Sequence, residues 1–104
     1  MAYSLIFSTA SSKDEAQHIA RALVEQKLVA CVNIIGPMDS IYRWKGEIES
    51  AQEFLLMMKT ESERFERVRD AVKSLNSYEV PEVMQVSVEN GLPAYLQWIS
   101  TSIG

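Results

Sequence analysis

The sequence has one cysteine and one histidine, which limits the chemistry that a single copy of the chain can carry out. One cysteine excludes an intrachain disulfide and is typical of a reducing compartment, so we expect a cytoplasmic protein. The only histidine, His18, leaves no His/Cys spacing for a tetrahedral zinc site and little basis for Ser-His-Asp or Cys-His catalysis. It falls off the apolar stripe of its helix, and we expect it to face solvent.

Long apolar runs and basic stretches are missing as well. No segment approaches the roughly 20 apolar residues that a membrane helix needs, and the first residues lack the positive flank and apolar length of a secretory signal. The net charge is −4, and the arginines between positions 64 and 69 alternate with acidic residues, as on a solvated helix face. We therefore expect neither membrane nor nucleic-acid binding. Recognition of RNA on a sheet, as in RRM domains, also lacks its basic Gly-aromatic motif.

The pattern that is present predicts one domain over residues 1–104 with an α+β, ferredoxin-like fold. Capping boxes at 12–15 and 60–63 predict two helix starts, Gly36-Pro37 should interrupt or bend a strand, and Lys45-Gly46 is a hairpin turn. The resulting order is βαββαβ followed by a terminal helix. We expect strands at about 3–9, 28–35, 41–44, 47–58 and 83–88, and helices at about 13–26, 65–75 and 93–99.

The hairpin formed by the two middle strands is too long for a domain of this size. A return strand of about 12 residues spans roughly 40 Å, whereas the domain should be about 35 Å across, so the hairpin tip overhangs it. The overhang and its base carry side chains that commonly anchor interfaces, namely Tyr42, Trp44, Ile48 and Phe54. We expect sister subunits to cover them. The alternative is a hairpin that curls back and is covered by the last helix.

Two groups of side chains in the strands are candidate metal ligands. Cys31 lies in the middle of a strand and is either a small buried apolar residue or a soft-metal ligand. Glu47, Glu49 and Glu53 alternate along one face of the return strand, where they form either a solvated edge that discourages aggregation or a weak site for hard cations.

The loop around Tyr78 to Glu82 contains a proline and several polar side chains. We expect Lys59, Tyr78 and Glu82 to form one polar cluster suited to an anion or a small ligand. The alternative is a structural turn whose polar groups satisfy one another. No Gly-rich phosphate loop accompanies it.

Five segments together resemble the divalent-cation tolerance protein CutA family over about residues 4–99; they are 28–34, 40–46, Glu53 with Lys59-Thr60, 78–82 and 95–99. The resemblance implies a homotrimer related in architecture to the PII signalling proteins, with clefts between subunits, and a link to tolerance of divalent cations, particularly copper. Cys31 matches the cysteine of the family's ACV motif, which is implicated in copper binding. Lys59, Tyr78 and Glu82 match positions that line the family's intersubunit cleft.

The sequence departs from the family pattern just before Tyr78, where Asn76-Ser77 replaces the usual His-Pro. Asn is a poorer copper or zinc ligand than imidazole, so Cys31 and carboxylates are the expected metal contacts. We expect a homotrimer that binds divalent cations, copper first, or a small ligand at subunit interfaces, without an organic cofactor. The alternative is a small-molecule enzyme that uses Lys59 and Glu82 as an acid–base pair.

Overall fold

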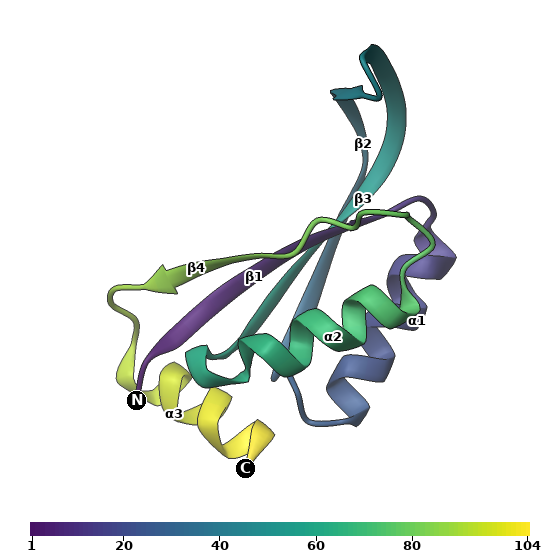
Figure 1. The fold of residues 1–104 in the computed structure, drawn as a ribbon. Helices are drawn as coiled ribbons and strands as arrows, with labels where there is room; N and C mark the ends of the chain where they lie inside the picture. The colour runs from purple at the N-terminus through teal and green to yellow at the C-terminus, as the bar shows by residue number, and fades with distance from the viewer.

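The computed structural model describes residues 1–104 as a four-stranded antiparallel sheet with two helices packed against one face (Figure 1). The strand order is β2-β3-β1-β4, and all neighbouring strands run antiparallel. The elements are β1 (Tyr3–Ala10), α1 (Lys13–Glu25), β2 (Cys31–Trp44), β3 (Glu47–Glu61), a short 3-10 turn (Ser62–Arg64), α2 (Phe65–Leu75), β4 (Met84–Val88) and α3 (Pro93–Ile103). The predicted α+β, ferredoxin-like fold with a long hairpin and a terminal helix is confirmed.

The core lies between the sheet and helices α1 and α2. Alternate residues of β1 and β3 point to the helices because successive side chains of a strand face opposite ways, while α1 and α2 contribute side chains three and four positions apart. Burying each large aliphatic side chain contributes roughly 1.5–3 kcal/mol. The largest of these fully buried apolar residues are Ile6, Ile19, Leu23, Leu56, Met58, Val29, Val68 and Val72.

One of the two predicted capping boxes is present. At the start of α1 the Ser12 hydroxyl accepts a hydrogen bond from the Glu15 amide at 3.1 Å. The second box is wrong, because β3 continues to Glu61 and α2 begins without a side-chain cap. Thr60 is fully buried and donates its hydroxyl proton to the Leu28 carbonyl at 2.7 Å. This tertiary hydrogen bond holds Thr60 in the strand instead of at a helix start.

The segment between α1 and β2 also differs from the prediction, which began a strand at residue 28. Lys27 has a φ of +58°, Leu28 donates its amide proton to the Leu23 carbonyl at 3.0 Å, and the strand begins at Cys31. Leu28 and Val29 turn their side chains into the core. A short apolar run has the same appearance in a buried turn as in a buried strand.

The β2–β3 hairpin projects beyond the helices, as predicted (Figure 1), and gives the chain an extent of 44 × 26 × 23 Å. Its register shifts between Ile35 and Met38, so the interruption predicted at Gly36-Pro37 is confirmed as a bulge-like irregularity. A Cβ atom added to Gly36 would lie 2.7 Å from the Phe54 ring, which explains why the strand has glycine where it crosses this ring.

The hairpin tip leans toward the loop between α2 and β4, rather than toward the last helix. At the turn, Lys45 has φ +49° and Gly46 has φ +81°, and the Lys45 ammonium lies 3.8 Å from the Glu79 carboxylate. Helix α3 is at the other end of the molecule (Figure 1), where the Ser100 hydroxyl donates to the Glu61 carboxylate at 2.6 Å. The alternative in which the last helix covers the hairpin is therefore wrong.

The sheet face opposite α1 and α2 is largely uncovered and apolar, and we call it the open face. Its exposed members include Ile35 (48% exposed), Met84 (56%) and Val86 (49%). The strand registers place the following apolar residues on it: Leu5, Phe7, Ile35, Leu55, Met57, Met84 and Val86. None of the three helices has the length and apolar character needed to cross a membrane.

Candidate functional site

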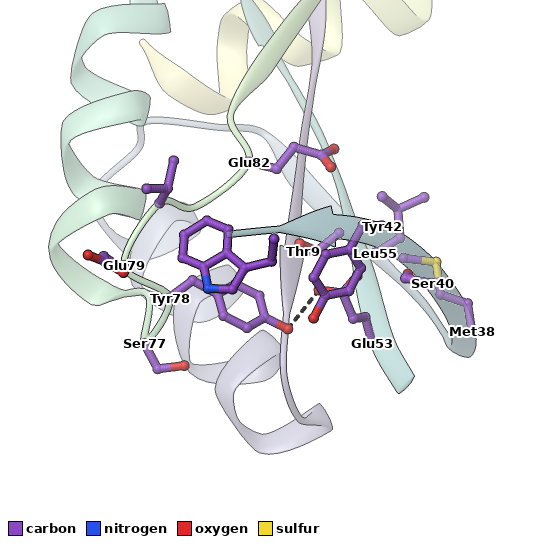
Figure 2. Close-up of a pocket in the computed structure, with 12 residues that line it drawn as sticks. Thr9, Met38, Ser40, Tyr42, Glu53, Leu55, Ser77, Tyr78, Glu79 and Glu82 are labelled. Atoms are coloured by element: carbon purple, nitrogen blue, oxygen red, sulfur yellow. Dashed lines mark hydrogen bonds between the residues drawn. The ribbon is translucent and has the colours of Figure 1, made fainter. Parts of the chain in front are cut away.

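A pocket of about 570 Å³ lies between the inner side of the hairpin and the loop of residues 76–82 (Figure 2). The hairpin reaches it because the register shift at Gly36-Pro37 exchanges the two faces of β2: odd positions such as Ile35 lie on the open face before the shift, and even positions after it. The lining residues are Thr9, Met38, Ser40, Tyr42, Trp44, Glu53, Leu55, Ser77, Tyr78, Glu79, Val80 and Glu82.

Asn76 shapes the loop that forms the outer wall of the pocket. Its side-chain amide donates to the Thr9 carbonyl at 2.9 Å, and its side-chain oxygen accepts the Tyr78 amide proton at 2.9 Å. The second bond is a local Asx-type turn that presets the backbone direction. Asn76, which stands where the CutA pattern usually has histidine, thus has a structural role here.

Glu15 fixes the same loop from helix α1, a role that its sequence position did not indicate. Its carboxylate accepts the Ser77 amide proton at 2.9 Å and the Ser11 amide proton at 3.1 Å. Burial acts to raise the pKa of Glu15, but the hydrogen bonds from Ser77 and Ser11 outweigh it, so this pKa lies below its ordinary value. The ionised carboxylate therefore ties the loop to the start of α1.

The strongest contact inside the pocket joins Tyr78 to Glu53. The Tyr78 hydroxyl donates to Oε2 of Glu53 at 2.6 Å (Figure 2). Burial, followed by the hydrogen bond to Glu53 and its negative charge, raises the pKa of Tyr78. Glu53 is only 9% exposed, so its prediction as part of a solvated edge is wrong, whereas Glu47 and Glu49 nearer the tip are exposed as expected.

Glu82 adds a second carboxylate to the pocket. Burial and then the negative charge of Glu53 raise its pKa above the ordinary value. Glu82 accepts no hydrogen bond from a side chain, and no lysine or arginine lines the pocket. The pocket is therefore acidic, with aromatic walls contributed by Tyr42, Trp44 and Tyr78.

Lys59 does not lie in this pocket within one chain. It is opposite Leu5 on one side and Cys31 on the other, and its ammonium is 5.7 Å from the centre of the Tyr95 ring. Six residues of strand separate it from Glu53, or about 20 Å. The structure thus brings Tyr78 and Glu82 together without Lys59, so a single chain forms neither the three-residue cluster nor a Lys59–Glu82 acid–base pair. A site that combines these residues from different chains stays a prediction.

Cys31 lies on the same side of the sheet as the open face and has a free, half-buried thiol. No group of three or more His, Cys, Asp or Glu side chains in the chain is arranged to hold a metal ion. Any metal bound through Cys31 would therefore need ligands from further copies of the chain or from solvent. His18, the only imidazole, is exposed as expected.

The four predicted interface residues fall on different surfaces. Tyr42 (42% exposed) and Trp44 (37%) line the pocket, while Ile48 (70%) is on the opposite side of the hairpin. Phe54 is half-buried and packs against the core of its own chain. Their contacts with sister subunits stay predictions.

The four-stranded sheet, the overlong hairpin with an acidic pocket beneath it, and the terminal helix together define a class: small α+β subunits of ferredoxin-like fold that carry a projecting β-arm. The comparisons with known proteins place the chain within that class.

The family model described as "CutA1 divalent ion tolerance protein" matches residues 4–102. The divalent-cation tolerance protein CutA of Archaeoglobus fulgidus is 45% identical over 101 residues, covering 97% of this chain and 98% of that protein. Human protein CutA is 47% identical over 96 residues, covering 92% of this chain and 54% of the human protein. The solved structure of the divalent cation tolerance protein Cut A1 from Thermus thermophilus matches with a TM-score of 0.94 at 40% identity, covering 98% of this chain and 99% of that one. The chain belongs to the CutA family of divalent-cation tolerance proteins.

Proposed function

We propose that this chain assembles as a homotrimer and binds divalent cations, with copper the leading candidate, or a small ligand at the interfaces between its subunits. Membership of the divalent-cation tolerance family supports the role in metal response. The number of three subunits follows the architecture that the CutA resemblance implies. A cytoplasmic location remains a prediction from the single cysteine.

The observation that carries this proposal is the open face. Monomeric proteins rarely expose contiguous apolar patches of more than a few hundred Å², and each Å² of apolar surface removed from water contributes roughly 25 cal/mol. Ile35, Met84 and Val86 are each about half exposed in the isolated chain. A sister chain that covers them would bury a face that the chain's own helices leave to solvent.

The metal part of the proposal depends on bringing several copies of Cys31 or of nearby carboxylates together. A thiolate is a soft ligand that suits copper(I), whereas carboxylates suit harder cations. Cys31 is on the side of the sheet that the sister chains would cover. A threefold assembly supplies three thiols where one chain supplies one.

Copper titration of the assembled protein tests this proposal. Copper(I) and copper(II) are added separately to the wild type and to Cys31→Ala, and light scattering of the same samples checks that the assembly is intact. We expect the wild type to bind copper(I) and Cys31→Ala to lose that binding. Equal, weak binding by both proteins would remove Cys31 from the site. Glu63→Gln, an exposed carboxylate change, serves as a matched control.

A further inference from the structure

The charge of the pocket under the hairpin is one-sided. Glu53, Glu79 and Glu82 line it, and no cationic side chain does. The raised pKa of Glu82 reflects burial and the nearby charge of Glu53. A negatively charged ligand would increase this repulsion, whereas a positively charged one would relieve it. The absence of Lys59 from the pocket removes the one feature that favoured an anion.

Glu53 has an oxygen available for a ligand. The Tyr78 hydroxyl occupies Oε2 at 2.6 Å, while Oε1 makes no hydrogen bond or ion pair with the chain. Because Glu53 is only 9% exposed, solvent screens its charge less than that of a surface carboxylate. Figure 2 shows Tyr78 and Tyr42 on either side of this carboxylate.

The hairpin tip already demonstrates how an ammonium group fits the rim of this pocket. The Lys45 ammonium lies 5.6 Å from the centre of the Trp44 ring and 3.8 Å from the Glu79 carboxylate. Both partners line the pocket. A cation over an aromatic face and beside a carboxylate is the arrangement that proteins use to recognise organic ammonium ions.

The size and lining of the pocket suit an organic molecule better than a bare metal ion. A volume of about 570 Å³ is within the range of small-molecule sites. Met38, Leu55 and Val80 add apolar surface between the charged groups. No set of three metal-ligating side chains is present to replace the water around a metal ion.

We propose that this pocket binds an organic cation, an amine with an apolar body, between the aromatic side chains of the hairpin and the carboxylates of Glu53 and Glu82. The inference rests on the small-ligand part of the proposed function and specifies the class of ligand. The ammonium group lies at Oε1 of Glu53, and the apolar body lies against Trp44 and Leu55.

Three probes of nearly equal shape test the inference: benzylamine, which is cationic at pH 7, benzyl alcohol, which is neutral, and benzoate, which is anionic. Calorimetric titration of the intact assembled protein measures their affinities. We expect benzylamine to bind about tenfold more tightly than benzyl alcohol, from the combined cation–π and charged hydrogen-bond contributions, and benzoate to bind least. The indole N–H signal of Trp44 should shift on binding, while that of Trp98 on α3 should not.

Matched variants locate the cation. Glu53→Gln and Glu82→Gln should each lower benzylamine affinity by about three- to tenfold and leave benzyl alcohol binding unchanged, while Glu63→Gln should change neither. Glu82→Gln is informative even if Glu53→Gln perturbs the fold, because no side-chain hydrogen bond depends on Glu82.

The outcomes separate this inference from the proposed function. Equal or tighter binding of benzyl alcohol or benzoate would show that the pocket takes a small ligand of another class. If no probe binds while copper still binds through Cys31, the pocket inference is overturned and the metal function stands. If benzylamine is selected but copper does not bind, the organic-cation inference stands and the metal part of the proposal fails.

Discussion

The Tyr78 hydroxyl lies 2.6 Å from Oε2 of Glu53 and so joins the loop after α2 to the middle of the long strand β3. These two residues form opposite walls of the pocket, and their bond holds the loop against the base of the hairpin (Figure 2). Hydrogen bonds with an ionised acceptor are shorter and stronger than neutral ones. The pocket therefore has a defined shape before any ligand enters.

Loss of this hydrogen bond should destabilise the chain. In Tyr78→Phe the nearly buried Glu53 carboxylate loses its donor, and we expect the free energy of unfolding to fall by about 1–3 kcal/mol. Chemical denaturation measures the change. Tyr95→Phe is the control, because the Tyr95 hydroxyl makes no hydrogen bond with the chain, and it should differ from the wild type by less than about 0.5 kcal/mol. Equal stability of the two variants would show that the Tyr78–Glu53 bond contributes nothing measurable.

Glu82→Gln should stabilise the chain at neutral pH. The pKa of Glu82 is raised above its ordinary value of 4.5 by burial and by Glu53, so the folded state binds this proton more tightly than the unfolded state. The resulting stability is fully present below the unfolded pKa and is lost as the pH rises through the folded pKa. At pH 7 the uncharged variant should gain less than about 1 kcal/mol, because Glu82 is partly exposed to solvent.

At pH 4 the difference between Glu82→Gln and the wild type should disappear, because Glu82 is then protonated in both states. Thermal unfolding followed from pH 4 to pH 7 measures this trend, and Glu63→Gln should show no such pH dependence. A variant that is less stable than the wild type at pH 7 would contradict the assigned burial of Glu82.

Glu15→Gln should act in the opposite direction. The hydrogen bonds from Ser77 and Ser11 hold the pKa of Glu15 below 4.5 despite its partial burial, so its stabilising effect is present above the unfolded pKa and is lost as the pH falls through the folded pKa. We expect the variant to lose about 1 kcal/mol at pH 7 and less at pH 3. Urea unfolding at the two pH values measures this loss. Glu25→Gln, at the exposed end of α1, is the control, and an equal loss there would argue against the loop anchor.

A charge on the open face should weaken subunit association. Val86 faces that side of β4, whereas its neighbour Gln85 points to the opposite side, and both are exposed in the isolated chain. Val86→Glu should shift the particle toward smaller species at micromolar concentration, since it places a charge in an apolar interface, and Gln85→Glu should not. Sedimentation velocity compares the two. Equal assembly by both variants would exclude Val86 from the interface.

The sequence alone was sufficient for the order of elements and for the length of the hairpin, because apolar periodicity and the Gly36-Pro37 interruption are local signals. It was not sufficient at Thr60 and Leu28. These two residues bond to each other through a hydroxyl and a carbonyl far apart in the chain, and such a tertiary contact overrides the local capping and strand patterns.

The candidate site was predicted in part for the same reason. Tyr78 and Glu82 are near each other in sequence and do share a pocket, but Lys59 does not reach them within one chain. Glu53 was predicted to be solvated because it alternates with exposed carboxylates. Only the folded arrangement shows that the 76–82 loop covers it, through a hydrogen bond from a residue 25 positions away.

The mass of the particle in solution tests the central claim most directly, since the shared metal site and the interface clefts both require sister chains. Multi-angle light scattering of the wild type at micromolar concentration should give three times 11.8 kDa, or about 35 kDa. A single monodisperse species of 11.8 kDa would mean that the open face stays in water, and it would contradict the proposed assembly.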